Sequence, residues 1–254
     1  MRDVPGPAKA GHYLLAIYLL AIAWLAAPGV AHAQAGWIDH ARVSIDFGML
    51  PSATTTKTVY LEPSTINTAY DVPKGQFFDG GVLIRVAGGF GVGATVSSFT
   101  KSQAATVSGT IPHPFFFNTP RAISGTTSAL ERSETGVHIQ AAYVISAPRV
   151  DIAISGGPTF FNVSQDLVSD VAYSEAYPYD TATFTSATVI KVSATKIGFN
   201  AGVDVGVKLS KTFGVGGLVR FSRASATFPL ANTASGVSAD VGGVQAGGGV
   251  RFFF

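Results

Sequence analysis

The segment KIGFNAGVDVGVKL, residues 196–209, alternates strictly between apolar side chains and polar or small ones. Every odd-numbered position is apolar, from Ile197 to Leu209, and the even-numbered positions carry Lys, Asn, Asp or Gly. A period of two places the apolar side chains on one face of a β-strand, whereas a helix would scatter them around its axis. Strands of soluble proteins usually have about five or six residues, so this run predicts an unusually long strand.

Seven further segments show the same alternation. They are residues 42–49, 77–87, 90–101, 136–146, 149–160, 213–222 and 244–254. Short turns follow the second, fourth and sixth of the eight predicted strands, while the other connections are longer and irregular, the longest between Gln165 and Lys196. An even number of strands, with short turns on one rim and long loops on the other, is typical of outer-membrane barrels.

The first 33 residues are predicted to be a secretory signal peptide. An apolar run at residues 13–27 follows a basic start, and Ala31 and Ala33 form a small-residue cleavage site. The run is shorter than the about 20 apolar residues that a membrane-spanning helix needs. We therefore expect two parts, a signal peptide at 1–33 and an exported barrel at 34–254.

Composition decides where the apolar faces point. Hydrophobic residues make up 47% of the chain and charged residues only 13%, against about a quarter in ordinary soluble domains. The predicted strands carry charges of both signs on their polar faces, and no amphipathic helix is available to cover the apolar ones. The predicted fold class is therefore all-β, an eight-stranded antiparallel transmembrane up-and-down β-barrel with apolar side chains toward lipid.

Four charged residues on the predicted lumen face are candidates for a charge network. They are Asp46, Arg85, Asp204 and Arg220. One interpretation is a salt-bridge plug that replaces a hydrophobic core, and the other is the gate of a narrow pore. Because side chains generally fill the interior of an eight-stranded barrel and an unpaired buried charge is costly, we favour the plug.

Two of the long loops, residues 110–121 and 173–184, combine Pro with clustered aromatic residues. Exposed aromatic side chains suggest contact with a surface partner, a glycan or lipid headgroups. The alternative is that these rings cap the barrel mouth or belong to the aromatic girdle at the membrane interface. The loop interaction candidates are Phe115, Phe116, Phe117, Tyr177 and Tyr179.

The sequence offers little for catalysis or cofactors. His138 falls on a lumen face and His113 in a loop, but no spacing of Ser, His or carboxylates singles out an active site. The Gly-rich stretch at 88–93 lies between two strands and opens no helix, so it is not a phosphate loop. Cys is absent, and a net charge of +2 gives no reason to expect nucleic acid. We expect no catalytic, cofactor or metal-binding residues.

The chain ends in GGGVRFFF, which places Val250, Phe252 and Phe254 on the lipid face of the last strand. With its signal peptide, eight alternating strands and this ending, the chain resembles the eight-stranded bacterial outer-membrane β-barrel proteins, such as the membrane domain of outer membrane protein A and its short relatives. The resemblance implies a place in the Gram-negative outer membrane. It also implies that these three residues form an assembly signal for the barrel-assembly machinery.

These observations lead to an expected function without a named ligand. We expect a monomeric, non-enzymatic outer-membrane protein in contact with outer-membrane lipid, with a structural or surface-interaction role through its long extracellular loops. A narrow pore or small-solute channel is the alternative. A lipid-modifying outer-membrane enzyme is a more distant alternative, and its catalysis would require His138.

Overall fold

The computed structural model describes residues 39–50, 53–61, 64–72, 75–116, 118–147, 149–228 and 237–254. The predicted signal peptide at 1–33 and the interaction candidate Phe117 lie outside the described residues. All the described residues belong to one compact unit, Ile38–Phe254. Among them, no helix is long and apolar enough to cross a membrane.

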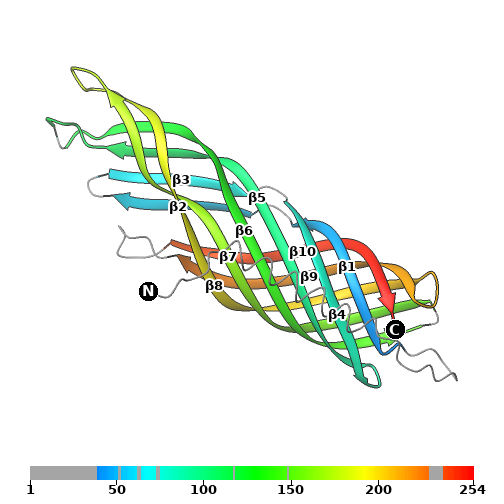
Figure 1. The fold of residues 1–254 in the computed structure, drawn as a ribbon. Coiled ribbons are helices and arrows are strands. Elements are labelled where there is room, and N and C mark those ends of the chain that lie inside the picture. The colour runs from blue at the N-terminus through cyan, green and yellow to red at the C-terminus, as the bar shows by residue number, and fades with distance from the viewer. Residues whose placement is uncertain are drawn as a thin grey trace, which may run out of the picture. The chain divides into compact units, whose positions relative to one another are not determined.

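The described chain is almost entirely strand. Its ten strands are β1 (Ala41–Leu50), β2 (Ala53–Leu61), β3 (Ser64–Val72), β4 (Gly75–Ala87), β5 (Phe90–Ile111), β6 (Arg121–Ser146), β7 (Val150–Glu175), β8 (Ala182–Lys208), β9 (Phe213–Phe228) and β10 (Val237–Phe253). Eight of them form a closed ring in the order β1, β4, β5, β6, β7, β8, β9, β10, and every neighbouring pair is antiparallel (Figure 1). These eight correspond to the predicted strands, so the predicted fold class is confirmed.

The ring closes where the last strand meets the first. Phe252 of β10 pairs with Val43 of β1, and the register continues to Ala246 opposite Met49. At the rim, the Phe254 carbonyl oxygen accepts hydrogen bonds from the backbone N–H groups of His40 and Ala41, at 2.7 and 3.1 Å. Closure leaves neither of these strands with a free edge in the membrane segment, where water is not available to satisfy backbone groups.

The long connections differ from the expected irregular loops. In the connection that leads along the chain from β1 to β4, β2 and β3 form a hairpin. β3 of this hairpin pairs with β5 from Thr65 to Ala69. β5 pairs with β6 as far as Ile111 opposite Arg121, and β7 pairs with β8 as far as Glu175 opposite Ala182. The expectation of irregular loops was wrong because backbone pairing continues far beyond the segments with the clearest alternation. In Figure 1 the β5–β6 and β7–β8 hairpins extend together at the end away from the C-terminus.

We call the part of the barrel on the side of the short turns and the C-terminus the lower barrel. Large apolar side chains cover its outside. Those exposed there include Ile45, Phe47, Met49, Ile84, Phe90, Val92, Ile139, Tyr143, Ile154, Phe160, Ile197, Phe199, Val203, Val205, Val215, Val219, Phe221 and Val244. We call this surface the lipid belt. A water-soluble barrel would bury these side chains, so the belt identifies the part of the wall that faces lipid.

Above the lipid belt the polarity of the wall inverts. On β9 the outward side chains change from Val219 and Phe221 to Arg223, Ser225 and Thr227. The inward ones change from Arg220 and Ser222 to Ala224, Ala226 and Phe228, which are 7%, 0% and 0% exposed. A polar outside and an apolar inside are the arrangement of a barrel in water. The upper wall therefore projects beyond the membrane and has a hydrophobic core of its own.

The projecting parts of β5–β8 form a structure that we call the stalk, residues 100–111, 121–135, 162–175 and 182–195. Its core contains Ala105, Val107, Ile111, Ile123, Leu130, Val163, Leu167, Val168 and Val171, with Phe184, Val189 and Val192 packed against it. Between β6 and β7 the backbone pairing ends at Arg132 opposite Gln165, so side chains join the two hairpins above this point. Gly125 of β6 fits under the Phe184 ring of β8, where an added Cβ would lie 2.1 Å from Phe184 Cδ1.

Candidate functional site

Arg251 of β10 lies in the lumen of the lower barrel and is fully buried. Its Nη1 donates to Asp46 Oδ1 at 2.8 Å, and its Nη2 donates to Asp204 Oδ2 at 2.9 Å. Arg42 Nη2 lies 3.2 Å from the other oxygen of Asp204. Strands β1, β8 and β10 thus supply two arginines and two carboxylates to one ion cluster, in which the opposite charges offset the cost of burial.

Arg220 of β9 forms a second buried ion pair. Its Nη2 donates to Asp79 Oδ2 at 2.5 Å, and both side chains are at most 1% exposed. The same guanidinium donates from Nη1 to Thr95 Oγ1 at 2.9 Å and from Nε to Gln245 Oε1 at 2.8 Å. Its side chain therefore bridges the lumen, from β9 to β4 and β5.

The structure places the predicted charge network only in part. Asp46, Asp204 and Arg220 lie in the lumen, and each forms an ion pair there. Arg85 does not join them, and its Nη2 donates instead to Ser146 Oγ at 2.6 Å. This part of the prediction was wrong because Arg85 lies near the end of β4, beside a register shift between Arg85 and Ala87, where its side chain reaches the rim.

The partners Asp79, Arg42 and Arg251 were absent from the predicted network. All three stand on the polar face of alternating strands, so the alternation marks them as facing the lumen. It does not show which charges meet across the barrel, because each pair joins residues far apart in the sequence.

The ion pairs leave little free space in the middle of the lumen. A cavity of about 30 Å³ remains between the two clusters, lined by residues that include Ser44, Thr95, Gln140 and Ser155. This volume holds roughly two water molecules. Buried ion pairs that cross the lumen are the arrangement that the plug interpretation predicts.

His138 of β6 is completely buried in a polar layer next to Arg220. Its Nε2 lies 2.9 Å from Ser97 Oγ, and its Nδ1 lies 2.8 Å from Thr159 Oγ1. Asn200 Nδ2 also donates to Thr159 Oγ1, at 2.8 Å. A Ser–His pair can activate a nucleophile, but the residue that orients the imidazole here is a hydroxyl rather than a carboxylate. With 0% exposure, His138 offers no surface to a substrate, and its geometry fits a hydrogen-bonded filler.

Within the described part of the chain, no group of three or more His, Asp or Glu side chains could hold a metal ion. Each carboxylate of the ion clusters above is paired with an arginine, which already offsets its charge. No site for a metal cofactor is therefore assigned.

At the far end of the stalk, the β5–β6 and β7–β8 loops meet. Phe115, Phe116 and Tyr177 are exposed by 66%, 65% and 85%. The Phe115 ring packs on Tyr179 at 5.7 Å between centroids, and Tyr179 packs edge-on against Tyr177 at 6.1 Å. We call Phe115, Phe116, Tyr177 and Tyr179 the tip surface. Two loops that the sequence marks separately thus form one aromatic surface.

Two buried side chains hold the tip surface in place. His113 Nδ1 accepts hydrogen bonds from the backbone N–H groups of Phe115 and Phe116, at 3.1 and 3.2 Å. Arg121 joins the two loops, because its Nη1 donates to Glu175 Oε2 at 2.6 Å and to the Tyr179 carbonyl at 2.9 Å. Its Nη2 also donates to the carbonyl of Pro112 at 2.9 Å. No sequence pattern marks these supporting roles, since every partner is distant or uses its backbone.

The predicted assembly-signal residues lie on the outer face of β10. The Phe252 ring packs 5.8 Å from that of Phe213, and Phe254 is half exposed at the rim. Phe253 points inward, is 1% exposed, and lies 5.0 Å below the Lys208 ammonium. The alternation of Phe252, Phe253 and Phe254 follows the predicted faces of the last strand.

Comparison with known proteins finds similarity in structure alone. No family model and no curated protein matches the chain. One similar solved structure is Ail, the attachment invasion locus protein of Yersinia pestis, in complex with the heparin analogue sucrose octasulfate, at 11% identity and a TM-score of 0.38 over 84% of this chain and 99% of that one.

Two other similar structures are outer-membrane proteins. The outer membrane protease OmpT of Escherichia coli is 10% identical, with a TM-score of 0.45 over 84% of this chain and 96% of that one. The outer membrane protein AlkL is 12% identical, with a TM-score of 0.36 over 89% of this chain and 96% of that one. Similarity at this level transfers no activity to the chain. Its closed ring, lipid belt and ion-paired lumen are those of an eight-stranded transmembrane β-barrel.

Proposed function

We propose that the chain is an outer-membrane surface protein whose plugged barrel anchors a rigid stalk that presents an aromatic contact surface to a partner outside the cell. The observation that carries this proposal is the tip surface. There, Arg121 and His113 lock two sequence-distant loops together while Phe115, Phe116 and Tyr177 stay exposed.

The position of the tip surface argues against an aromatic girdle. The outward side chains of β7 are apolar up to Phe160, and from Asn162 onward they include Ser164 and Asp166. The strand then continues to Glu175, which at about 3.3 Å per residue is roughly 40 Å along the strand. Rings at that distance from the lipid belt do not meet the headgroups of the membrane in which the barrel sits.

The stalk is built to hold this surface rigidly. Its strands are paired along each hairpin with only local register shifts, and its core side chains are almost completely buried. Lys191 of β8 also forms an ion pair of 2.9 Å with Glu131 of β6, and the hydrogen bond to Glu131 raises the pKa of the Lys191 ammonium. A contact surface that is ordered before binding loses less conformational entropy when a partner binds.

Large exposed aromatic side chains are frequent anchors of binding interfaces, whereas monomeric proteins rarely expose clusters of them. The tip surface also contains tyrosine hydroxyls beside apolar rings, which suits a partner with both apolar and hydrogen-bonding groups. In the same proposal the barrel is a monomer in outer-membrane lipid, inserted by the barrel-assembly machinery. The pore alternative gains no support from the lumen, since ion pairs fill it.

The experiment compares bacteria that display the wild-type chain with bacteria that display a Phe115→Ser, Phe116→Ser, Tyr177→Ser variant. Both are applied to an array of immobilised glycans and extracellular proteins, and equal display is checked with an antibody to an epitope tag. We expect the wild type to bind at least one array member and the variant to lose at least tenfold of that binding.

The matched control is Thr183→Ser, Thr185→Ser on the outward face of the stalk, which leaves the tip surface unchanged. Arg121→Gln should weaken binding without removing any ring, because it releases the β7–β8 loop from the β5–β6 loop. Identical binding profiles for the wild type and the triple variant would refute a role of the tip surface.

A further inference from the structure

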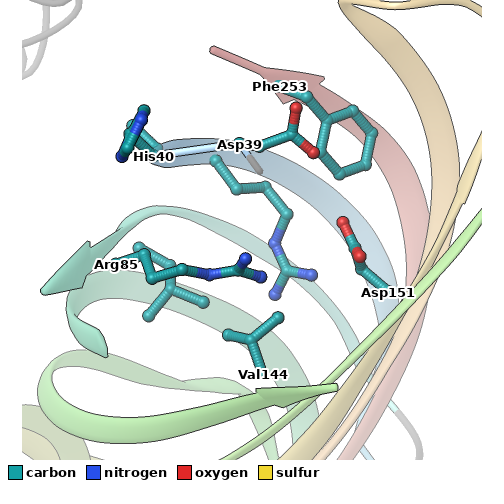
Figure 2. Close-up of a pocket in the computed structure, with 9 residues that line it drawn as sticks. Asp39, His40, Arg85, Val144, Asp151 and Phe253 are labelled. Atoms are coloured by element: carbon teal, nitrogen blue, oxygen red, sulfur yellow. The ribbon is translucent and has the colours of Figure 1, made fainter. Parts of the chain in front are cut away.

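A small cavity opens at the rim where β1, β4, β7 and β10 end, on the side of the short turns. Its volume is about 20 Å³, and its lining includes Asp39, Arg42, Arg85, Asp151 and Phe253. Figure 2 shows Arg85 reaching into this space from one side, with Asp151 on the opposite side and the Phe253 ring above. We call it the mouth cavity. It lies below the Arg251 cluster and is separate from the tip surface.

Arg42 lines the mouth cavity and carries a buried donor that has no partner. Its Nη2 is engaged by Asp204 at 3.2 Å, and its side chain is 9% exposed. Its Nη1 is buried and has no hydrogen-bond partner among the described residues. A buried guanidinium donor without an acceptor costs free energy, so this atom marks a place where an acceptor would stabilise the protein.

Arg85 brings a second positive charge whose neighbours do not neutralise it. Its Nη2 donates to the neutral hydroxyl of Ser146 at 2.6 Å, and no ion pair joins it to a carboxylate in the described part of the chain. Each of the two carboxylates that line the cavity pairs one of its oxygens with Lys208. Lys208 Nζ pairs with Asp39 and lies 3.2 Å from Asp151 Oδ2.

We propose that the mouth cavity binds one small anion, a halide ion or a single carboxylate group, between the guanidinium groups of Arg42 and Arg85. Guanidinium groups bind anionic acceptors with strong, charge-assisted hydrogen bonds. The volume admits a monatomic ion or the end of a carboxylate. Since the ion pairs of Arg251 cross the lumen next to it, we place the anion in a cup at the rim of the short turns and not along a channel.

A competing occupant follows from Asp151. Its Oδ1 is also buried without a partner, so a water molecule that bridges Arg42 Nη1 and Asp151 Oδ1 would satisfy both atoms. Water and anion differ in one measurable respect, because only the anion makes the environment of the two guanidinium groups depend on the kind and concentration of the salt.

The experiment uses the full folded barrel in lipid nanodiscs, with ¹⁵N-labelled arginine. The guanidinium ¹⁵N resonances of Arg42 and Arg85 are followed by NMR during titration with sodium bromide or with sodium acetate, and the sodium salt of a bulky aromatic sulfonate keeps the ionic strength constant. We expect saturable shifts of both resonances. Saturation with bromide alone identifies a monatomic site, and saturation with acetate as well identifies a carboxylate site.

Arg85→Gln should weaken the saturable binding at least tenfold while the Arg42 resonance remains as the reporter. This variant loses only a hydrogen bond to Ser146 at the rim, so it should still insert. Its folding is checked by the heat shift, the difference in migration on SDS gels between unheated and boiled samples of a folded barrel. The matched control is Arg223→Gln, an exposed residue paired with Asp240 above the lipid belt, which should leave binding unchanged. Shifts that stay linear with both salts, or equal affinity in Arg85→Gln, would overturn the anion site and leave water as the occupant.

Discussion

The guanidinium of Arg220 on β9 donates a 2.5 Å hydrogen bond to Asp79 Oδ2 on β4, although β10 and β1 stand between these strands in the ring. The pair therefore crosses the lumen instead of running along the wall. It fixes two distant parts of the wall to each other, as a hydrophobic core does in a soluble protein. The stability of the barrel should depend on this pair.

Arg220→Met removes the cation and leaves the Asp79 carboxylate buried without its partner. Breaking a buried pair in this way is expected to lower the free energy of unfolding by about 3–5 kcal/mol. The measurement is urea unfolding of the barrel in lipid vesicles. The double variant Arg220→Met, Asp79→Asn leaves no unpaired charge and should be clearly more stable than the single one. Equal losses in both would show that the charge pairing contributes nothing.

The plugged lumen predicts that the barrel does not conduct ions. In planar bilayers we expect no openings above leak for the wild type. Arg220→Ala should be silent as well, because Arg251 still bridges Asp46 and Asp204 below it. Single-channel recording tests this directly. Stepwise openings in the wild type whose conductance changes in Arg220→Ala would support the pore instead.

His138 is predicted to stabilise the barrel and to have no catalytic role. His138→Ala leaves Ser97 and Thr159 without their imidazole partner in a buried layer, and the loss in unfolding free energy should be about 1–3 kcal/mol. Chemical denaturation measures this loss. In parallel, turnover of phospholipid and lipid A is measured with the wild type and the variant. Turnover by the wild type that disappears in His138→Ala would establish the enzyme alternative.

Gly125 should be needed for the stalk but not for the barrel. In Gly125→Val, the new side chain meets the Phe184 ring, and overpacking of this kind costs about 1–3 kcal/mol. We expect faster amide hydrogen exchange in the stalk and unchanged exchange in the lower strands. The control Ala122→Val places the same side chain on the exposed outer face three residues earlier. A uniform change along the whole barrel would contradict an independent stalk core.

Phe254 is predicted to act in assembly more than in stability. Phe254→Ser removes a half-exposed ring at the rim but keeps the carbonyl that binds His40 and Ala41. Insertion into outer membranes should be slower, while the free energy of unfolding changes little. Pulse-labelling combined with the heat shift on gels measures the rate of insertion. Phe253→Ser is the informative comparison, because Phe253 packs inside and its loss should lower stability. Normal insertion of Phe254→Ser would remove the assembly claim.

The eight strands of the ring, and the face on which each side chain lies, follow from the amino-acid sequence alone. Alternation with a period of two is a local property, so it can be read from any stretch of the chain, as from Ile197 to Leu209. The low charge content and the lack of an amphipathic helical pattern then assign the apolar faces of the lower strands to lipid. The closure of β10 on β1 follows, since an open edge would leave backbone groups unsatisfied in the bilayer.

The stalk shows where local pattern stops. On β9 the apolar positions up to Phe221 are odd-numbered apart from the buried Leu218, and from Ala224 to Phe228 they are even-numbered, so apolar side chains change from the outer face to the inner one. This change of parity is visible in the sequence and could have indicated where the membrane ends. Its meaning depends on what lies inside the upper wall, where side chains of several strands form one core.

Which residues meet across the barrel is a property of the folded ring. The Arg251 cluster joins β1, β8 and β10, and Arg121 reaches Glu175 and Tyr179 from another hairpin. Arg85 was expected in the lumen network and lies at the rim instead. Alternation sets the direction of a side chain but not its height in the barrel, which depends on the register and tilt of all the strands between the two partners. Contacts across the lumen therefore had to come from the three-dimensional structure.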